Sequence, residues 1–333
     1  MFTQRRVWQV PVIVVLLLLL SQPAFSKTNI VDLGSLGGGD SSAFGVNNRG
    51  QVVGYSNTLP GDYNYNGFLW RSKGGMQDLG GLGWGSPRRI NDPGQVVGYY
   101  STDAGDSYAF LWTASGVRQD LGTLGGPGSE AYDINNVGQV VGASYFDDSR
   151  VSHAFFWTAG APMQDLGTLG GADSVATGIN DDGVVVGYST TGEGERHAFL
   201  WSAAGGMQDL GTLGGGSSVA NDINNQGLVV GQSVTAEGAY HAFMWSADAR
   251  MQDLGTLGGS ESQAYAINNR GQVVGESGTD TGWSHAFRWT LKGGMQDLGA
   301  LAGWSAASGV TEQGMVVGRC LTKSGEYHAC IWP

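Results

Sequence analysis

The sequence predicts an all-β fold built from seven tandem units of four short strands each. Three observations lead to this prediction: a glycine content that helices do not tolerate, motifs that recur in step, and two hairpins in every copy. Glycine occupies 58 of 333 positions, more than double its usual share of about 7%. A glycine inside a helix costs about 1 kcal/mol relative to alanine, so the chain is expected to form strands and turns.

Three motifs recur seven times each, with a period near 44 residues. The Asp-Leu-Gly triplets begin at Asp32, Asp78, Asp120, Asp165, Asp209, Asp253 and Asp297. The Val-Val-Gly triplets end at Gly54, Gly98, Gly142, Gly187, Gly231, Gly275 and Gly318. A tryptophan closes each copy, at Trp70, Trp112, Trp157, Trp201, Trp245, Trp289 and Trp332. Because these markers agree, they indicate a repeat architecture.

Each copy contains two predicted hairpins. In the first copy, residues 43–46 and 51–56 flank the turn Asn47-Asn48-Arg49-Gly50, whose last residue suits a positive φ. A His-Ala-Phe-Leu-Trp strand and a Met-Gln-Asp-Leu-Gly strand form the second hairpin of a typical copy. Four strands in about 44 residues is the size of a propeller blade, so we expect a seven-bladed β-propeller. A parallel β-helix, with shorter coils, is the weaker alternative.

The two ends of the repeat array complement each other. The last copy stops at Pro333 without a Met-Gln-Asp-Leu-Gly strand, whereas residues 29–34 form an extra copy of that strand. We therefore expect the N-terminal strand to complete the last blade and close the ring, because an open array would leave two raw sheet edges.

The first 26 residues have the layout of a cleaved signal peptide. Arg5 and Arg6 precede an apolar run over residues 10–20, and Ala24-Phe25-Ser26 has small residues around the expected cleavage point. No later segment is apolar enough to enter a membrane. We therefore expect a signal peptide over 1–26, a single propeller domain over 27–333, and a secreted or periplasmic protein.

The charge balance argues against nucleic acid as a partner. The chain has 17 basic and 29 acidic residues, and cleavage after Ser26 removes two of the basic ones. An acidic surface repels phosphate backbones. We expect a monomer without a cofactor, whose partner is an extracellular glycan or protein of unknown identity.

The repeated phrase resembles the HAF repeat family of probable extracellular bacterial repeats. His197-Ala198-Phe199-Leu200-Trp201 contains the motif that names the family, and the resemblance covers nearly the whole chain after the signal peptide. Three copies depart from it, with Asn66, Tyr108 and Cys330 in place of motif residues. The resemblance implies export and a bacterial source, and it implies no established activity.

The histidines and cysteines are expected to be structural. All five histidines occupy one repeat position: His153, His197, His241, His285 and His328. Equivalent positions on packed sheets lie about 10 Å apart, too far to share a metal ion, so each ring is expected to make one hydrogen bond in its own blade. Cys320 and Cys330 are the only cysteines, on neighbouring predicted strands of the last copy. An exported protein favours a disulfide between them, and two buried free thiols are the alternative.

One loop partly matches a calcium-binding pattern. Asp62, Asn64 and Asn66 carry spaced oxygen atoms, but Lys73 stands where a full EF-hand needs glutamate. A shorter calcium loop and an ordinary polar turn both remain open.

The loops between the second and third strands differ most among the copies, whereas the Asn-x-x-Gly turns at the opposite end barely vary. Variable loops are where binding residues concentrate, and aromatic side chains suit a sugar or a protein partner. The candidate ligand-binding residues on this face are Tyr63, Tyr65, Trp84, Tyr108, Trp283 and Trp304.

The sequence thus favours a non-catalytic binding module. No nucleophile or phosphate-binding motif is apparent, and no catalytic residue is assigned. The alternative is an extracellular polysaccharide hydrolase or lyase with two carboxylates at the channel mouth.

Overall fold

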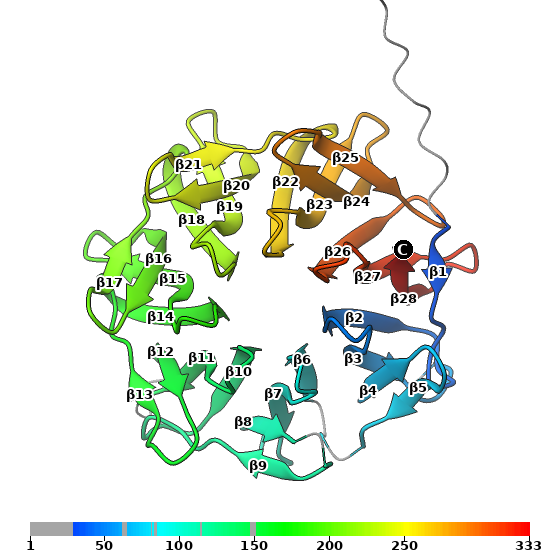
Figure 1. The fold of residues 1–333 in the computed structure, drawn as a ribbon, viewed down its shortest axis with the longest axis horizontal. Helices are drawn as coiled ribbons and strands as arrows, with labels where there is room; N and C mark the ends of the chain where they lie inside the picture. The colour runs from blue at the N-terminus through cyan, green and yellow to red at the C-terminus, as the bar shows by residue number, and fades with distance from the viewer. Residues whose placement is uncertain (1–28, 62–64, 81, 83–84, 114, 147–150) are drawn as a thin grey trace, which may run out of the picture.

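The computed structural model describes residues 29–61, 65–80, 82, 85–113, 115–146 and 151–333. These residues form β-strands and no helix, so the predicted all-β class is confirmed. Figure 1 shows the sheets arranged radially around a central axis. Among the described residues there is accordingly no helix that would reach across a bilayer. The predicted signal peptide lies outside the described residues.

Four strand positions repeat from the axis outward (Figure 1). The innermost strands are β2 (Ser41–Val46), β6 (Ser86–Ile90), β10 (Ser129–Ile134), β14 (Gly170–Ile179), β18 (Gly214–Ile223), β22 (Gly258–Ile267) and β26 (Ser305–Val310). The second strands are β3 (Val52–Asn57), β7 (Val96–Ser101), β11 (Val140–Tyr145), β15 (Val185–Thr191), β19 (Val229–Thr235), β23 (Val273–Thr279) and β27 (Val316–Leu321). The third strands are β4 (Tyr65–Arg71), β8 (Ser107–Trp112), β12 (Ser152–Trp157), β16 (Arg196–Ser202), β20 (Tyr240–Ser246), β24 (Ser284–Thr290) and β28 (Tyr327–Trp332). The outermost strands are β5 (Gly75–Asp78), β9 (Arg118–Asp120), β13 (Gln164–Asp165), β17 (Gly206–Asp209), β21 (Arg250–Asp253), β25 (Gly294–Gly299) and β1 (Val31–Asp32).

The described strands group into five four-stranded sheets and one eight-stranded sheet. The eight-stranded sheet consists of two four-stranded halves, joined by one parallel residue pair between Arg196 and Ser217. Neighbouring strands within each four-stranded group are antiparallel, as expected for successive hairpins. The sheet of β26, β27 and β28 takes its fourth strand from the other end of the chain, because Val31 pairs with Ile331 and Asp32 with Cys330.

The Val-Val-Gly motif explains how the inner and second strands fit together. In the repeat that contains β14 and β15, Val185 and Val186 are fully buried, and Gly187 lies opposite Ala176. A Cβ on Gly187 would overlap the Val175 carbonyl, so only glycine fits there. The register then shifts between Ala176 and Gly178, which is a β-bulge. Bulges re-aim side chains, and at this position the bulged residues face the axis.

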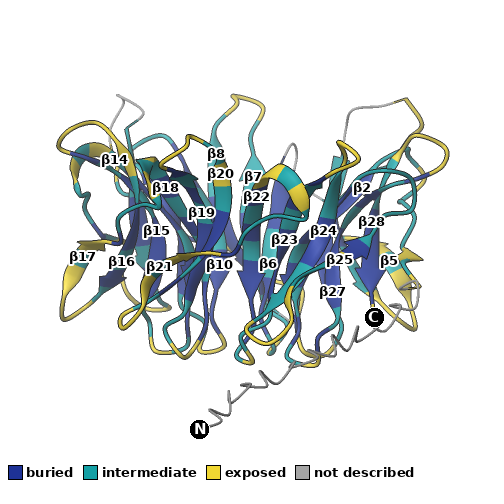
Figure 2. Ribbon diagram, turned by 90° about the horizontal axis from the view of Figure 1, so that it is seen from above, coloured by how far each residue is buried: buried dark blue, intermediate teal, exposed yellow. Residues whose placement is uncertain are grey.

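The core lies between successive sheets. One cluster joins Val186 and Ala198 of one copy to Ala220, Val229 and Phe243 of the next. The motif phenylalanines, such as Phe243, have no exposed surface. Burying a side chain of this kind contributes about 1.5–3 kcal/mol. Each sheet is therefore stabilised by its neighbours, with the middles of the inner strands buried and the exposed residues on the loops and on outermost strands such as β5 and β17 (Figure 2).

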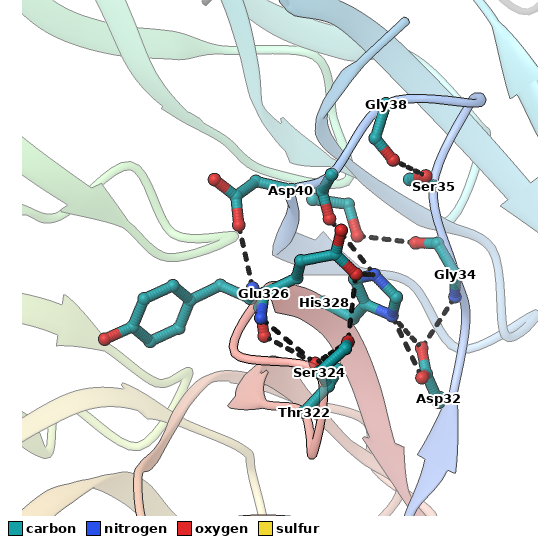
Figure 3. A network of polar contacts seen from close by, with 12 residues as sticks. Asp32, Gly34, Ser35, Gly38, Asp40, Thr322, Ser324, Glu326 and His328 are labelled. Atoms are coloured by element: carbon teal, nitrogen blue, oxygen red, sulfur yellow. Dashed lines mark hydrogen bonds and ion pairs between the residues drawn. The ribbon is translucent and has the colours of Figure 1, made fainter. Parts of the chain in front are cut away.

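The histidines make the expected structural hydrogen bonds. In each copy that has one, the ring Nδ1 lies 2.7–2.9 Å from the aspartate of the Asp-Leu-Gly motif. His328 makes this contact with Asp32 across 296 positions, where β1 meets β28 (Figure 3). The same aspartate accepts the N–H of the motif glycine, as Asp32 does from Gly34 at 2.8 Å. The histidine and Asp-Leu-Gly motifs therefore recur because each supports the other.

Candidate ligand-binding site

The strands end at two faces that differ in chemistry. The turn face comprises the Asn-x-x-Gly turns between first and second strands. The loop face comprises the loops between second and third strands, together with the connections between copies. Between the two faces, the inner strands surround a central channel region in which two separate cavities lie.

A series of hydrogen bonds connects the turns across the turn face. In each copy the second turn residue donates its backbone N–H to the side-chain oxygen of its counterpart in the next copy, at 2.8–3.0 Å. The residues in chain order are Asn48, Asp92, Asn136, Asp181, Asn225, Asn269 and Glu312. The final link runs from the Glu312 amide back to Asn48 Oδ1, 2.8 Å away. Much of the hydrogen-bonding capacity at this mouth is thus used within the protein.

The channel near the turn face contains a buried charged cluster. A cavity of about 170 Å³ is lined in part by Arg89, Asp133 and Asp222. Arg89 Nε lies 3.5 Å from Asp133 Oδ1, and Arg89 Nη1 donates to the carbonyls of Phe44 and Ser308. Burial raises the pKa of Asp133 to about 7, against the opposing effect of Arg89. Burial raises the pKa of Asp222 as well.

Both carboxylates in this cluster have structural partners. Asp133 Oδ2 accepts the Ile179 amide, and Asp222 Oδ2 accepts the Ile267 amide, each at 2.9 Å. Each of these bonds joins one copy to the next. A buried carboxylate that accepts hydrogen bonds from backbone amides fixes the position of those amides. The arrangement of this cluster is therefore more typical of a structural role than of a catalytic pair of carboxylates.

The loop face contains a more spacious cavity, of about 510 Å³. We call it the aromatic cavity. Its lining residues are Asp40, Phe44, Tyr55, Asn57, Tyr65, Ser86, Arg88 and Tyr99. They come from two successive copies, on β2, β3, β4, β6 and β7 and next to these strands. The Tyr55 ring lies 5.5 Å from the Phe44 ring and 5.0 Å from the Tyr65 ring, so three rings form a continuous apolar strip.

Arg88 connects the aromatic cavity with the channel. Together with Phe44 it also lines a second cavity of about 260 Å³ along the axis. Its guanidinium carbon lies 5.0 Å from the Phe44 ring centre, 5.3 Å from that of Tyr99 and 5.9 Å from that of Tyr132. Its Nε is buried and has no hydrogen-bond partner. The aromatic cavity thus contains a positive charge held by ring faces.

The aromatic residues predicted from the sequence do not form one platform. Tyr65 lines the aromatic cavity. Tyr108 packs on Tyr100 with ring centres 5.8 Å apart, in the next sheet. Trp304 packs edge-on against Tyr327 at 5.4 Å, and Trp283 is 51% exposed near Gly303. The four belong to separate sheets, because the loops of this face are distributed around the central axis.

Two further predicted binding residues, Tyr63 and Trp84, lie outside the described residues. Two of the candidate calcium ligands, Asp62 and Asn64, do so as well. The third, Asn66, donates its side-chain amide to Asp78 Oδ2 at 2.9 Å and so replaces the histidine of other copies. In the described part of the chain, no group of three His, Cys, Asp or Glu side chains is placed to bind a metal.

Cys320 and Cys330 are both buried free thiols in this structure, so the predicted disulfide is not present here. Cys320 pairs with His328, and Cys330 pairs with Gly318. The two cysteines are thus diagonal neighbours on one face of the sheet, and diagonal pairs are more widely separated than the Cβ distance of a relaxed disulfide. Bonding would require a small backbone movement, and the disulfide stays a prediction.

Of the residues that line the aromatic cavity, sequence reasoning found only Tyr65 and missed the other seven, among them Phe44, Tyr55, Arg88 and Tyr99. A usable signal existed at Arg88, which occupies a repeat position held by Phe, Tyr, Thr, Asn or Ser in the other copies. That position is the β-bulge, whose effect on side-chain direction is not visible in a strand pattern.

Comparison with known proteins supports the fold. The family model described as "Protein of unknown function (DUF3466)" matches residues 171–288. No curated protein matches. The β-propeller domain of the trilobed protease from Pyrococcus furiosus is 10% identical, with a TM-score of 0.57, and the match covers 88% of this chain and 95% of that one.

Two other solved structures show a similar arrangement. A puromycin hydrolase mutant has a TM-score of 0.58 and 13% identity, and the match covers 88% of this chain but only 52% of the hydrolase chain. A lectin from Burkholderia pseudomallei has a TM-score of 0.51 and 9% identity, covering 90% of this chain and 98% of that one. At these identities the likeness concerns architecture alone. This chain therefore has a β-propeller fold.

Proposed function

We propose that the protein is a seven-bladed β-propeller, closed by its N-terminal strand, that binds a ligand on its loop face without catalysis. The five four-stranded sheets and the two halves of the eight-stranded sheet correspond to seven blades. The β1–β28 pairing and the bond from Glu312 to Asn48 support closure. We also propose that the repeats belong to the HAF family, on the motif resemblance.

One observation carries the functional proposal: the two faces use their polar groups differently. At the turn face the second turn residue of each copy bonds to the next copy. At the loop face the aromatic cavity presents rings and a guanidinium that lacks a hydrogen-bond partner at Nε. Concave sites with apolar walls and a few polar groups are typical of ligand binding.

Binding is favoured over hydrolysis because the aromatic cavity has one carboxylate among its described lining residues. That carboxylate is Asp40, whose Oδ1 accepts the Tyr327 amide at 2.7 Å. Glycoside hydrolysis ordinarily requires two carboxyl groups on either side of the bond that breaks. A lectin is among the similar structures, and a glycan is the ligand class we propose.

A glycan-array screen combined with a hydrolysis assay tests this proposal. We expect retention of at least one glycan without cleavage, and Tyr65→Ala should abolish retention while leaving the melting temperature unchanged. Tyr108→Ala, on the next sheet and outside the aromatic cavity, is the matched control and should bind normally. Cleavage of the bound glycan would contradict the proposal, as would a loss of binding caused only by substitutions at Asn48 or Asn136.

We propose further that the protein is exported, with cleavage after Ser26. The basic start, the apolar run and the small residues before position 27 support this. Intact-mass measurement of the protein from culture medium or periplasm should give a chain beginning at Lys27. A chain that still begins at Met1 would rule out cleavage.

A further inference from the structure

We infer that the ligand of the aromatic cavity is a glycan that ends in a carboxylate-bearing sugar, a hexuronic acid, and that Arg88 binds its carboxylate. This inference rests on the proposed function and specifies its ligand. Three features of the site carry it: the state of the Arg88 guanidinium, the ring faces beside it, and the charge of the surroundings.

The Arg88 guanidinium lacks a polar partner, in contrast to its neighbour in the chain. Arg89 contacts Asp133 and two backbone carbonyls. No hydrogen bond or ion pair joins the Arg88 side chain to any residue that the structure describes, and its Nε is buried and unpaired. A buried polar group that is left unsatisfied destabilises the protein, and a charged group does so more than a neutral one. An anionic ligand in the cavity that Arg88 lines would supply the guanidinium with the counter-charge that it lacks among these residues.

The geometry around Arg88 selects the kind of anion. The rings of Phe44, Tyr99 and Tyr132 lie 5.0–5.9 Å from the guanidinium carbon, at cation–π distance. Rings at this distance pack around the guanidinium, but they accept no hydrogen bond from the N–H groups that lie in the guanidinium plane. The planar fork of arginine matches a carboxylate, which it binds through two parallel hydrogen bonds. A carboxylate is therefore the anion that this group is suited to bind.

The rest of the ligand should have ring faces and hydroxyl groups. The strip formed by Phe44, Tyr55 and Tyr65 offers apolar surface next to Arg88, and its two tyrosines carry hydroxyls. Tyrosine combines an apolar ring with a polar tip, as a sugar combines a C–H face with an equatorial edge of hydroxyls. A cavity of about 510 Å³ holds a ligand of one or two sugar rings.

The charge of the protein restricts the ligand to few negative groups. The chain has a formal net charge of −12, and Asp40 lines the same cavity. A like-charged polymer would be repelled by this field. A single acidic sugar at the end of an otherwise neutral glycan adds one negative charge, which Arg88 can balance, whereas a polyuronate would bring further negative charges close to Asp40. We therefore expect a terminal uronate and not a polyuronate.

Matched pairs of disaccharides test the inference directly. The probes are disaccharides that end in glucuronic, galacturonic or mannuronic acid, each compared with its carboxyl-reduced neutral counterpart by calorimetric titration of the full exported chain. We expect at least one acid to bind about ten-fold or more tightly than its neutral counterpart. Binding of none of the six, or equal binding within every pair, would overturn the inference.

Variants then locate the preference. Arg88→Gln should abolish the preference for the acidic disaccharide. Tyr55→Ala should instead weaken the binding of the acidic disaccharide and of its neutral counterpart by the same factor. Arg319→Gln is the matched control, since its guanidinium also lies on a tyrosine ring, 4.1 Å from that of Tyr327, with a buried unpaired Nε, but it does not line the aromatic cavity. An acid preference that survives in Arg88→Gln would overturn the role of Arg88. If that variant does not fold, the paired disaccharides on the unmodified chain still decide.

The outcomes separate this inference from the proposed function. If neutral glycans bind through Tyr55 and Tyr65 and acidic glycans bind no more tightly, the proposed binding function is supported and the inference of a carboxylate-bearing ligand is contradicted. A short peptide with a free C-terminal carboxylate that binds through Arg88, where the acidic sugars do not, would assign the site to a protein partner. Glycan binding that is indifferent to both Tyr55→Ala and Arg88→Gln would place the site elsewhere and contradict the proposed function.

Discussion

The turn face and the loop face are the two ends of the same strands, yet they carry different residues that are engaged in different ways. At the turn face, asparagine, aspartate and glutamate side chains bond to the next copy, and the link from Glu312 to Asn48 returns to the first turn. At the loop face, the rings and Arg88 of the aromatic cavity face open space. On the proposed function, we expect the turn face to contribute mainly to stability and the loop face mainly to recognition.

The largest expected effect comes from removing the strand that joins the two chain ends. Deleting residues 29–34 removes the β1–β28 pairs, the His328–Asp32 contact and the packing of Ile30 and Leu33. We expect the turn-face hydrogen bonds alone not to replace these contacts, so the free energy of unfolding should fall by at least about 3 kcal/mol. Urea unfolding measures this.

The control for this deletion is Asp32→Ala, which removes the partner of His328 but leaves the strand in place. It should cost less than about 1 kcal/mol, because that pair is partly exposed. A deletion variant as stable as the intact chain would mean that closure at the outer rim is unimportant.

The next effect concerns the first residue of an Asn-x-x-Gly turn, which is buried at the turn face. Asn135 donates to the Asn180 carbonyl at 2.9 Å and to Gln139 Oε1, and its own Oδ1 accepts two backbone amides. Asn135→Ala should lower stability by about 2–3 kcal/mol, since it leaves buried groups unsatisfied, and should leave ligand binding unchanged. Thermal unfolding beside a binding titration measures both.

Its exposed neighbour provides the comparison. Asn136→Ala removes the side chain that accepts the Asp92 amide in a solvated position, and should cost less than about 1 kcal/mol. If Asn135→Ala loses ligand binding while it stays folded, the turn face takes part in binding, which would contradict the separate roles proposed for the two faces.

A smaller effect follows from the buried charged cluster. Because burial raises the pKa of Asp133 to about 7, the folded protein holds more protons than the unfolded chain between about pH 4 and pH 7. The free energy of unfolding should therefore fall as pH rises through this window. We expect a loss of about 1–2 kcal/mol, because the ionised Asp133 keeps its contact with Arg89 and its hydrogen bond from the Ile179 amide.

Asp133→Asn should flatten this part of the pH profile, as measured by urea unfolding between pH 4.5 and pH 7.5. Asp222→Asn should act in the same direction, because burial raises the pKa of that carboxyl too. A slope that is unchanged in both variants would show that these groups stay ionised, hydrated carboxylates.

The smallest effect concerns the last sheet, which contains both cysteines. If Cys320 and Cys330 oxidise on export, non-reducing peptide mapping should give one linked peptide. Reduction should then lower stability by about 2 kcal/mol or less, since the loop is short and the pair is diagonal. Thiols that alkylate fully in the folded, air-exposed protein would contradict the disulfide.

The repeated elements were predictable from the sequence because they depend on local rules. The hairpin turns, the Val-Val-Gly strands and the structural role of His197 follow from strand alternation and turn chemistry. The aromatic cavity was not predictable in the same way. Tyr55, Tyr65 and Arg88 belong to two copies, and a β-bulge directs Arg88 toward the axis. The four described aromatic residues of the predicted site, such as Trp283, belong to separate sheets and do not form a single patch.

The links of the turn face have one more consequence. Apart from the link between Glu312 and Asn48, their partners are 43, 44 or 45 positions apart in the sequence, yet all the bonds have nearly the same length. Insertions and deletions in the opposite loops are thus absorbed before the next turn is reached. The molecule therefore has a constant frame of strands and turns, on which loops of different length and sequence are accommodated. New specificities could be grafted onto one sheet at a time, with the frame left as it is.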